Sequence, residues 1–509
     1  MKKITALLLA AMLLLGGCSI GKRPYVPTGG ALEQGTTTKP VQKPTVTEQT
    51  LTLGYNPDGT LNPYTEADAT NRLLFSLMYQ GLFSLDRNYE AAPVLCKHYS
   101  VSKDMKTYVF YLEAATFSDG SPLTAADVIA SLQAAKEGPV YGGRFGYVGN
   151  ITVTEEGAVQ VDLTTPYENL PVLLDIPIVK AADVKSAWPM GTGVYYEESA
   201  LAGLRLVRRN DWWCYANVAA TAASIALLEV DSAATIRDDF EFGNIGLVCA
   251  DPGTDSYVDY RCDYELWNCE NGIFLYLACN EKSKTFSSAK MRAALTYAID
   301  RELLVSTYYG GFATAATLPA SPKSPYYNEK LAAQYAYDFT KFQQLVAEAA
   351  PNDTDISLLV NSADSRRIRV AKEIAAMLEA AGFTVTVKAL SGTSYTTALS
   401  KGNYDLHLGQ TKLSPNMDLS AFFAPKGALS YGSLSDAATY FLCQAALENF
   451  GNYYTLHQRV MSDGMLCPIL FRSYAIYGQR GLFPSLAPAR DHVFWYTTGK
   501  TMEDARIEP

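Results

Sequence analysis

Residues 102–128 read SKDMKTYVFYLEAATFSDGSPLTAADV and carry three structural signals in succession. The alternating aromatic and apolar side chains of Thr107–Leu112 predict a β-strand. Asp119 and Gly120 predict a tight turn, because glycine readily adopts the positive φ angle that many turns require. Thr124 follows the turn and has the hydroxyl that favours a helix N-cap. The stretch therefore predicts a strand, a turn and the start of a helix.

Strands and helices alternate through the rest of the chain. Residues 291–311, MRAALTYAIDRELLVSTYYGG, predict a long amphipathic helix over Ser288–Tyr309 that stops at the two glycines. Further strands are expected at Leu51–Tyr55, Ile151–Thr154, Val159–Leu163, Ala226–Val230, Gly246–Ala250, Ile273–Cys279, Ile356–Val360 and Thr384–Ala389. Further helices are expected at Thr70–Tyr79, Ala125–Lys136, Ala233–Phe242 and Arg366–Ala381. Such alternation predicts parallel sheets with helices on their faces.

The N-terminus predicts export. Lys2 and Lys3 precede an apolar run, Ile4–Leu15, which is too short to cross a bilayer of about 30 Å as a helix. A basic start, a short apolar run and small residues before a cut site predict a signal peptide at residues 1–17. The cysteine that follows, Cys18, makes the segment resemble a bacterial lipobox, which implies lipidation of Cys18. The alternative is an ordinary signal peptide with an incidental cysteine.

Residues 18–47 follow the signal peptide and are rich in Gly, Pro, Thr and Lys, which predicts a flexible tether between the lipid anchor and the folded protein. The formal net charge of the chain is -10, which argues against nucleic acid as a partner. Beyond Cys18 there are eight cysteines without metal-ligand spacing, so no metal or cofactor is expected. We expect most of them to be small buried side chains, although Cys262 and Cys269 could form a short-loop disulfide.

Catalytic motifs are few. The sequence contains no G-x-S-x-G, H-E-x-x-H or Walker motif. Two S-x-x-K matches occur, at 100–103 and 287–290, without the K-T-G strand that penicillin-binding enzymes also need. These observations predict a protein that is not an enzyme.

Several stretches together carry a family resemblance. They are LNPY at 61–64 with LMYQGLFSLD at 77–86, the stretch 102–128, MGTGVYY at 190–196 with LVRRNDWW at 206–213, the stretch 291–311 and, more weakly, KGNYDLHLGQ at 401–410. In this order they resemble the family 5 extracellular solute-binding proteins, the peptide and nickel receptors of bacterial ABC importers. Val194 departs from the pattern, since the family has proline there.

The resemblance implies an α/β, two-lobed fold of the class II periplasmic-binding-protein type, with an extra subdomain inserted in the first lobe. Lobe I would comprise residues 48–267, with the subdomain at about 65–188, lobe II residues 268–472, and residues 473–509 would return to lobe I. It also implies a monomeric, lipid-anchored, extracytoplasmic receptor. Such a receptor would bind a small solute, such as a peptide, and deliver it to an ABC permease and its ATPase subunits.

One strand departs from the peptide-binding relatives, which carry Gly-Trp-x-x-Asp-Tyr after a Tyr-Asp strand and use that aspartate to pair with the peptide amine. Here Gln410 replaces the tryptophan and Leu413 replaces the aspartate. A shift of one residue would place Lys412 or Ser414 there, and neither is an acid. Because a buried ammonium without a carboxylate is costly, short zwitterionic peptides are expected to bind poorly.

Alternatively, Asp418 or an acid from another loop binds the amine of the peptide. Lys412 would favour an anionic group. The candidate solute-binding residues are Tyr55, Asn62, Gln410, Lys412, Leu413 and Tyr474. Two other functions stay open at this stage: an exported peptidase or transpeptidase, and a sensory receptor for a signalling peptide.

Overall fold

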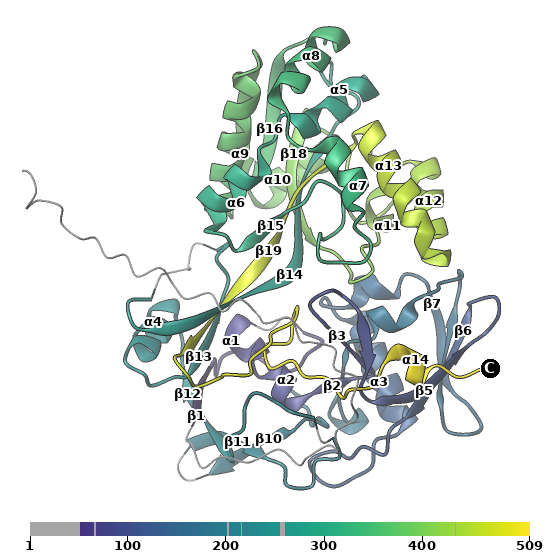
Figure 1. Ribbon diagram of the computed structural model, residues 1–509, viewed down its shortest axis with the longest axis vertical. Coiled ribbons are helices and arrows are strands. Elements are labelled where there is room, and N and C mark those ends of the chain that lie inside the picture. Colours follow the sequence, from purple (N-terminus) through teal and green to yellow (C-terminus); the bar gives the residue numbers. More distant parts are fainter. Residues whose placement is uncertain are drawn as a thin grey trace, which may run out of the picture.

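The computed structural model describes residues 51–65, 68–200, 203–214, 216–254, 260–432 and 434–508. The predicted signal peptide, Cys18 and the tether at 18–47 lie outside these residues. The described chain forms two α/β lobes, shown one above the other in Figure 1. No helix in the described part of the chain has both the length and the hydropathy needed to cross a bilayer.

Lobe I contains two four-stranded sheets. The first has the order β1-β12-β11-β10, formed by Leu51–Tyr55, Ser224–Glu229, Gly203–Arg208 and Tyr195–Ala200. The helices α1 (Ala69–Arg72), α2 (Phe75–Met78) and α4 (Ala233–Glu241) belong to the same part of the lobe. The second sheet has the order β5-β6-β8-β7, formed by Cys96–Val101, Thr107–Leu112, Val159–Leu163 and Val148–Val153. Small β-pairs complete the lobe: β2 (Gln80–Gly81) with β9 (Pro177–Ile178), and β3 (Phe83–Leu85) with β4 (Ala91–Pro93).

The stretch 102–128 folds as its sequence predicts. β6 is followed by a turn in which Gly120 has a φ of 83°, and α3 (Ala125–Glu137) begins after Thr124. Asp127 Oδ2 accepts hydrogen bonds from the backbone N and the hydroxyl of Thr124, at 2.9 and 2.6 Å. Asp127 Oδ1 also accepts from the backbone N of Ala181, at 2.8 Å. One acid thus caps α3 and ties it to a distant loop.

The largest sheet joins the lobes. Its order is β13-β19-β14-β18-β16-β17, formed by Leu247–Ala250, Leu466–Gln479, Tyr264–Cys279, Leu406–Lys412, Asp355–Asn361 and Thr384–Leu390, with β15 (Ala313–Ala315) beside β19. The two long strands β14 and β19 run from the lower lobe into the upper one (Figure 1). Their pairing is interrupted by a register shift between Glu270 and Phe274, where Gly272 has a φ of 74°.

Lobe II packs helices on both faces of this sheet. They are α5 (Ala289–Ala294), α6 (Arg301–Tyr309), α7 (Glu329–Ala332), α8 (Phe339–Ala349), α9 (Ser365–Glu379), α10 (Gly392–Lys401), α11 (Ser420–Phe423), α12 (Ala437–Glu448) and α13 (Tyr453–Asp463). Because successive side chains of a strand point to opposite faces, Leu275 and Leu277 enter one hydrophobic core while Phe274 and Tyr276 enter the other. This explains the unbroken apolar sequence of the strand.

The last described residues return to lobe I. The short helix α14 (Met502–Ala505) packs against β5, and the backbone N of Ile507 donates to the carbonyl of Tyr99 at 2.8 Å. The loop before α14 carries Arg490 and Asp491, whose side chains contact β18 of lobe II and the residue after it.

Three expectations from the sequence were wrong. The sheets are mixed: among the named strands of the described residues, β1·β12, β16·β17 and β16·β18 pair in parallel, and the other pairs are antiparallel. The segment 70–79 forms two short helices, and its cap is Asp68, which accepts from the backbone N of Asn71 at 2.9 Å. The helix expected over 288–309 is interrupted, because Asp300 is the N-cap of α6 and accepts from Leu303 N at 3.0 Å.

All eight cysteines in the described residues are free, including Cys262 and Cys269. Six of them are buried and the other two are half-buried, so the expectation of small buried side chains is confirmed.

Candidate functional site

Two cavities share Arg72 of lobe I, and a residue of lobe II reaches one of them. The first, of about 430 Å³, is called the hinge cavity and is lined by residues of α1, α4, β13 and β19, among them Arg72 and Tyr474. The second, of about 270 Å³, is called the inner cavity. Its lining residues are Pro63, Thr65, Arg72, Phe75, Pro139, Val140, Tyr141, Pro177, Lys412, Asp491 and His492. Most of these residues belong to lobe I, whereas Lys412 comes from lobe II, so the inner cavity lies between the lobes.

Arg72 lines both cavities. It is the last residue of α1, and its Nη1 donates to the Tyr474 hydroxyl on β19 at 2.9 Å. Burial opposes the charge of this guanidinium, but the neighbouring Tyr474 and Asp491 outweigh that effect and raise the pKa of Arg72. Arg72 therefore holds a permanent positive charge at the boundary of the two cavities.

Lys412 and Asp491 form an ion pair in the inner cavity. Lys412 is the last residue of β18, and its Nζ donates to both carboxylate oxygens of Asp491, at 2.6 and 2.7 Å. The Lys412 side chain is 33% exposed and that of Asp491 is 16% exposed. Burial lowers the pKa of Lys412 to about 8, against the attraction of Asp491, so Lys412 is mostly protonated at neutral pH.

Positive charges surround Asp491. Burial by itself would raise the pKa of this carboxyl group, but Lys412, Arg490 and Arg72 together hold it well below its ordinary value. Arg490 Nε lies 3.5 Å from Asp491 Oδ2, and Arg490 Nη2 donates to the carbonyl of Leu413 at 3.0 Å. Because three cations face one carboxylate here, the inner cavity favours an anionic or neutral solute group.

Of the six residues expected from sequence, Lys412 and Tyr474 line the cavities. The other four lie elsewhere and use their side chains within the fold. The Leu413 side chain is buried in a lobe II core, and Gln410 Oε1 accepts from Arg472 at 3.1 Å. The Tyr55 hydroxyl donates to Glu229 at 2.8 Å.

The fourth, Asn62, donates through its amide to the carbonyls of Val184 and Ser186, at 2.9 and 2.8 Å. Asp418, the alternative acid for an amine, accepts from Ser420 Oγ at 2.7 Å and from the Tyr147 hydroxyl at 3.4 Å, and it lines neither cavity.

Sequence reasoning missed Arg72, Asp491 and Tyr141. Arg72 lies in the segment 70–79, which was predicted only as an amphipathic helix. The spacing of its apolar residues does not indicate that a polar side chain lines a cavity. Asp491 lies in a loop without a motif, and it reaches Lys412 across 79 positions of sequence. A single acid before His492, in a loop that is otherwise mostly apolar, gave no distinguishing signal.

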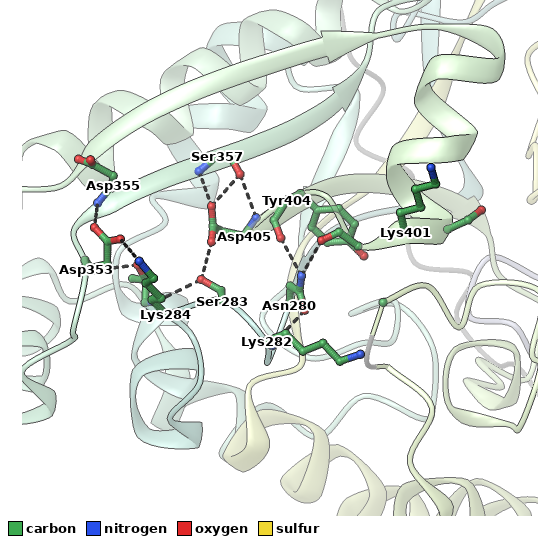
Figure 2. Close-up of a pocket in the computed structure, with 14 residues that line it drawn as sticks. Asn280, Lys282, Ser283, Lys284, Asp353, Asp355, Ser357, Lys401, Tyr404 and Asp405 are labelled. Atoms are coloured by element: carbon green, nitrogen blue, oxygen red, sulfur yellow. Dashed lines mark hydrogen bonds and ion pairs between the residues drawn. The ribbon is translucent and has the colours of Figure 1, made fainter.

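A third cavity, of about 440 Å³, lies at the far end of the lobe II sheet (Figure 2). Since β18 runs from Leu406 to Lys412, this end is about 20 Å from the Lys412 end. Its central acid is Asp405, which accepts from Ser283 Oγ at 2.6 Å and from Ser357 N and Oγ at 2.8 and 2.7 Å. Figure 2 shows both serines pointing at Asp405. These contacts tie β14, β16 and β18 together, and we assign them a structural role.

The S-x-x-K match at 287–290 does not form a serine site. Lys290 Nζ donates to Glu348 at 2.6 Å, and the Ser287 hydroxyl is turned to the carbonyl of Lys284. Among the described residues, no three His, Cys, Asp or Glu side chains are grouped so that they could hold a metal ion.

Comparisons with known proteins agree with this architecture. Residues 90–429 match the family model described as bacterial extracellular solute-binding proteins, family 5 Middle. The glutathione-binding protein GsiB of Escherichia coli (strain K12) is 28% identical over 325 residues, which cover 59% of this chain and 61% of GsiB. The chain thus spans about three fifths of the length of the curated relatives it matches.

Two solved structures share the fold. The ABC transporter substrate binding protein CtaP of Listeria monocytogenes has a TM-score of 0.71 at 18% identity, covering 88% of this chain and 97% of CtaP. NikA of Brucella suis, in complex with Fe(III)-EDTA, has a TM-score of 0.67 at 18% identity, covering 87% of this chain and 98% of NikA. At these identities the likeness establishes the class II binding-protein fold alone.

Proposed function

Because the chain belongs to the bacterial extracellular solute-binding proteins of family 5, we propose that it is the solute-binding receptor of an ABC importer. It captures a peptide or peptide-like solute between its lobes and delivers it to a membrane permease with its ATPase subunits. Binding rather than catalysis is its role, as it is for the relatives whose names describe binding proteins.

One observation carries the assignment of the site: two cavities share Arg72 of lobe I, and Lys412 of the opposite lobe lines the inner one. A solute that lies across both cavities contacts Arg72, Tyr474 and Lys412. A mostly preformed cavity with a few fixed polar groups is the usual form of a small-ligand site. The excess of cations supports a solute with a carboxylate, or a neutral one, facing Lys412.

The lobes close by a hinge in β14 and β19, near the expected boundaries at residues 267 and 472. The register shift around Gly272 supports this position, because an irregular strand bends more easily than a regular ladder. Small-angle scattering should give a smaller radius of gyration with a bound solute than without one.

The receptor is anchored on the outer face of the cell membrane through a lipid on Cys18, after removal of residues 1–17. The tether at 18–47 holds the lobes away from the bilayer. Some thirty flexible residues span about 30 Å in root-mean-square terms. The receptor acts as a monomer.

Native mass spectrometry of the protein purified from its own host tests the function. A receptor carries a non-covalent solute of defined mass that is released on unfolding. Incubation with a peptide pool then separates the receptor from an exported peptidase. The receptor leaves every peptide intact, and newly formed fragments would contradict the proposal.

A further inference from the structure

In the inner cavity, the ammonium group of Lys412 binds the carboxylate of Asp491 as the amine of a solute would. Among the described residues that line this cavity, Asp491 supplies the carboxylate. Both of its oxygens accept from one ammonium group, that of Lys412, at 2.6 and 2.7 Å. The two partners come from different parts of the chain: Asp491 from the loop that returns to lobe I, and Lys412 from the end of β18 in lobe II.

The two groups differ in how firmly they are held. Asp491 lies in a turn closed by two backbone hydrogen bonds between Ala489 and His492, at 3.0 and 2.8 Å, and beside Arg490, whose Nε is 3.5 Å from Oδ2. Lys412 reaches it on a flexible four-carbon stem that is one-third exposed to solvent. A lysine side chain can therefore leave the carboxylate without a change in the backbone, whereas the carboxylate stays in place.

We propose that Asp491 is a binding subsite for a primary ammonium group, and that Lys412 occupies this subsite and so excludes amine-bearing solutes. The role of this subsite in selecting solutes rests on the proposed function. The subsite itself is a property of the inner cavity and can be tested without a solute.

The geometry explains the exclusion. An ammonium group has three donors, and Lys412 already uses both oxygens of the carboxylate. A second ammonium in the same place would meet the positive charges of Lys412, Arg490 and Arg72. An incoming amine must therefore displace Lys412 into water, while a neutral or anionic solute group leaves the ion pair intact.

Chemical rescue of the Lys412→Ala variant tests the subsite. Removal of the lysine stem leaves room for an alkylammonium ion, and propylammonium at tens of millimolar should raise the Tm of K412A by about 2 °C, as expected for a ligand that binds the native state. n-Propanol has nearly the same shape without the charge and should give no such rise. The double variant K412A/D491N should not respond to propylammonium, and neither should the wild-type protein.

No response of folded K412A to propylammonium would overturn the proposal, as would an equal response to n-propanol or in the D491N background. If K412A does not fold, Lys412→Met keeps most of the apolar stem. Ammonium chloride should then stabilise K412M relative to sodium chloride at equal ionic strength, again only when Asp491 is present. A salt effect that is the same for both ions would overturn the proposal in that case.

A second arm separates the subsite from the proposed function. Calorimetry with tetraalanine, in free and N-acetylated forms, should show that the affinity of K412A for the free-amine peptide rises at least tenfold relative to its affinity for the acetylated peptide. If propylammonium rescues K412A but neither peptide binds any variant, the ammonium subsite stands and peptide capture fails. If the peptides bind but K412A shows neither rescue nor a gain for the free amine, capture stands and the subsite is wrong.

Discussion

The hydroxyl of Tyr89 lies 2.5 Å from Oε1 of Glu270, so a loop of lobe I is hydrogen-bonded to one of the two strands that connect the lobes. Tyr89 lies between β3 and β4, has a φ of 65°, and is packed among lobe II residues such as Phe274 and Leu413. The guanidinium of Arg490 lies over its ring, 5.4 Å from the centroid. Tyr89 thus joins both lobes and the returning loop at one point.

Tyr89→Phe should lower the free energy of unfolding by about 1.5–3 kcal/mol, because it removes a hydrogen bond to a buried carboxyl group. Glu270 is only 5% exposed, and its Oε2 has no hydrogen-bond partner in the described structure. Urea denaturation measures the effect. The matched control is Tyr111→Phe, which removes an exposed contact with Glu156 and should change the stability by less than about 0.5 kcal/mol. Equal effects of the two substitutions would contradict this account of Tyr89.

Local signals predicted those parts of the fold that depend on neighbours in sequence. Thr124 and the Asp119–Gly120 turn were correct because a cap and a tight turn are set by a few adjacent residues. The helix over 288–309 was predicted as one piece because its apolar period continues through Asp300. The interruption depends on Arg301, which is buried and donates to the carbonyls of Ala316 and Pro468 at 3.1 and 2.9 Å.

The candidate site was harder to predict. Lys412 and Tyr474 were found through a family resemblance, whereas Asp491 and Arg72 were not found, because their role depends on contacts between distant segments. Leu413 was predicted to face the solute in place of an amine-binding acid. Its side chain proved to lie in the lobe II core, since alternate residues of an extended chain face opposite sides and Lys412 takes the cavity side.

Arg301→Met should destabilise the protein by about 3 kcal/mol or more, because it leaves several buried carbonyl groups without a donor. Besides the two carbonyls above, Arg301 Nη1 donates to the carbonyl of Thr296 at 3.0 Å and Nη2 to its hydroxyl at 2.8 Å. The control is Arg459→Met on α13, whose side chain is 42% exposed. A loss of stability in R301M no larger than in R459M would contradict the structural role of Arg301.

Acid should destabilise the protein through two buried histidines. Burial lowers the pKa of His457 and of His407 to about 3, and His457 has no hydrogen-bond partner for either ring nitrogen in the described structure. The unfolded chain binds these protons near pH 6.5 and the folded chain does not. The contribution of these histidines to stability is therefore complete above about pH 6.5 and falls by about 1.4 kcal/mol per pH unit for each histidine as the pH drops toward 3.

His457→Leu should remove about half of the change in the free energy of unfolding with pH that the two histidines cause. Urea denaturation at pH 7.5, 6 and 5 measures this change. An unchanged slope in H457L would mean that His457 takes up its proton in the folded state.

The proposed anchor is a lipid on Cys18, so Cys18→Ala should release the protein from membranes. The variant should no longer incorporate labelled palmitate and should appear in the soluble extracytoplasmic fraction, while its Tm stays the same. Continued lipid labelling and membrane association of C18A would place the anchor elsewhere.

We propose that the cavity between the lobes takes solutes without an exposed ammonium group, since Leu413 is buried in a core and Asp491 is held by Lys412. Calorimetry on matched peptides, with free and acetylated N-termini, tests this most directly. The acetylated peptides should bind at least tenfold more tightly than the free-amine forms. Tight binding of the free-amine peptide that is lost on acetylation would contradict it.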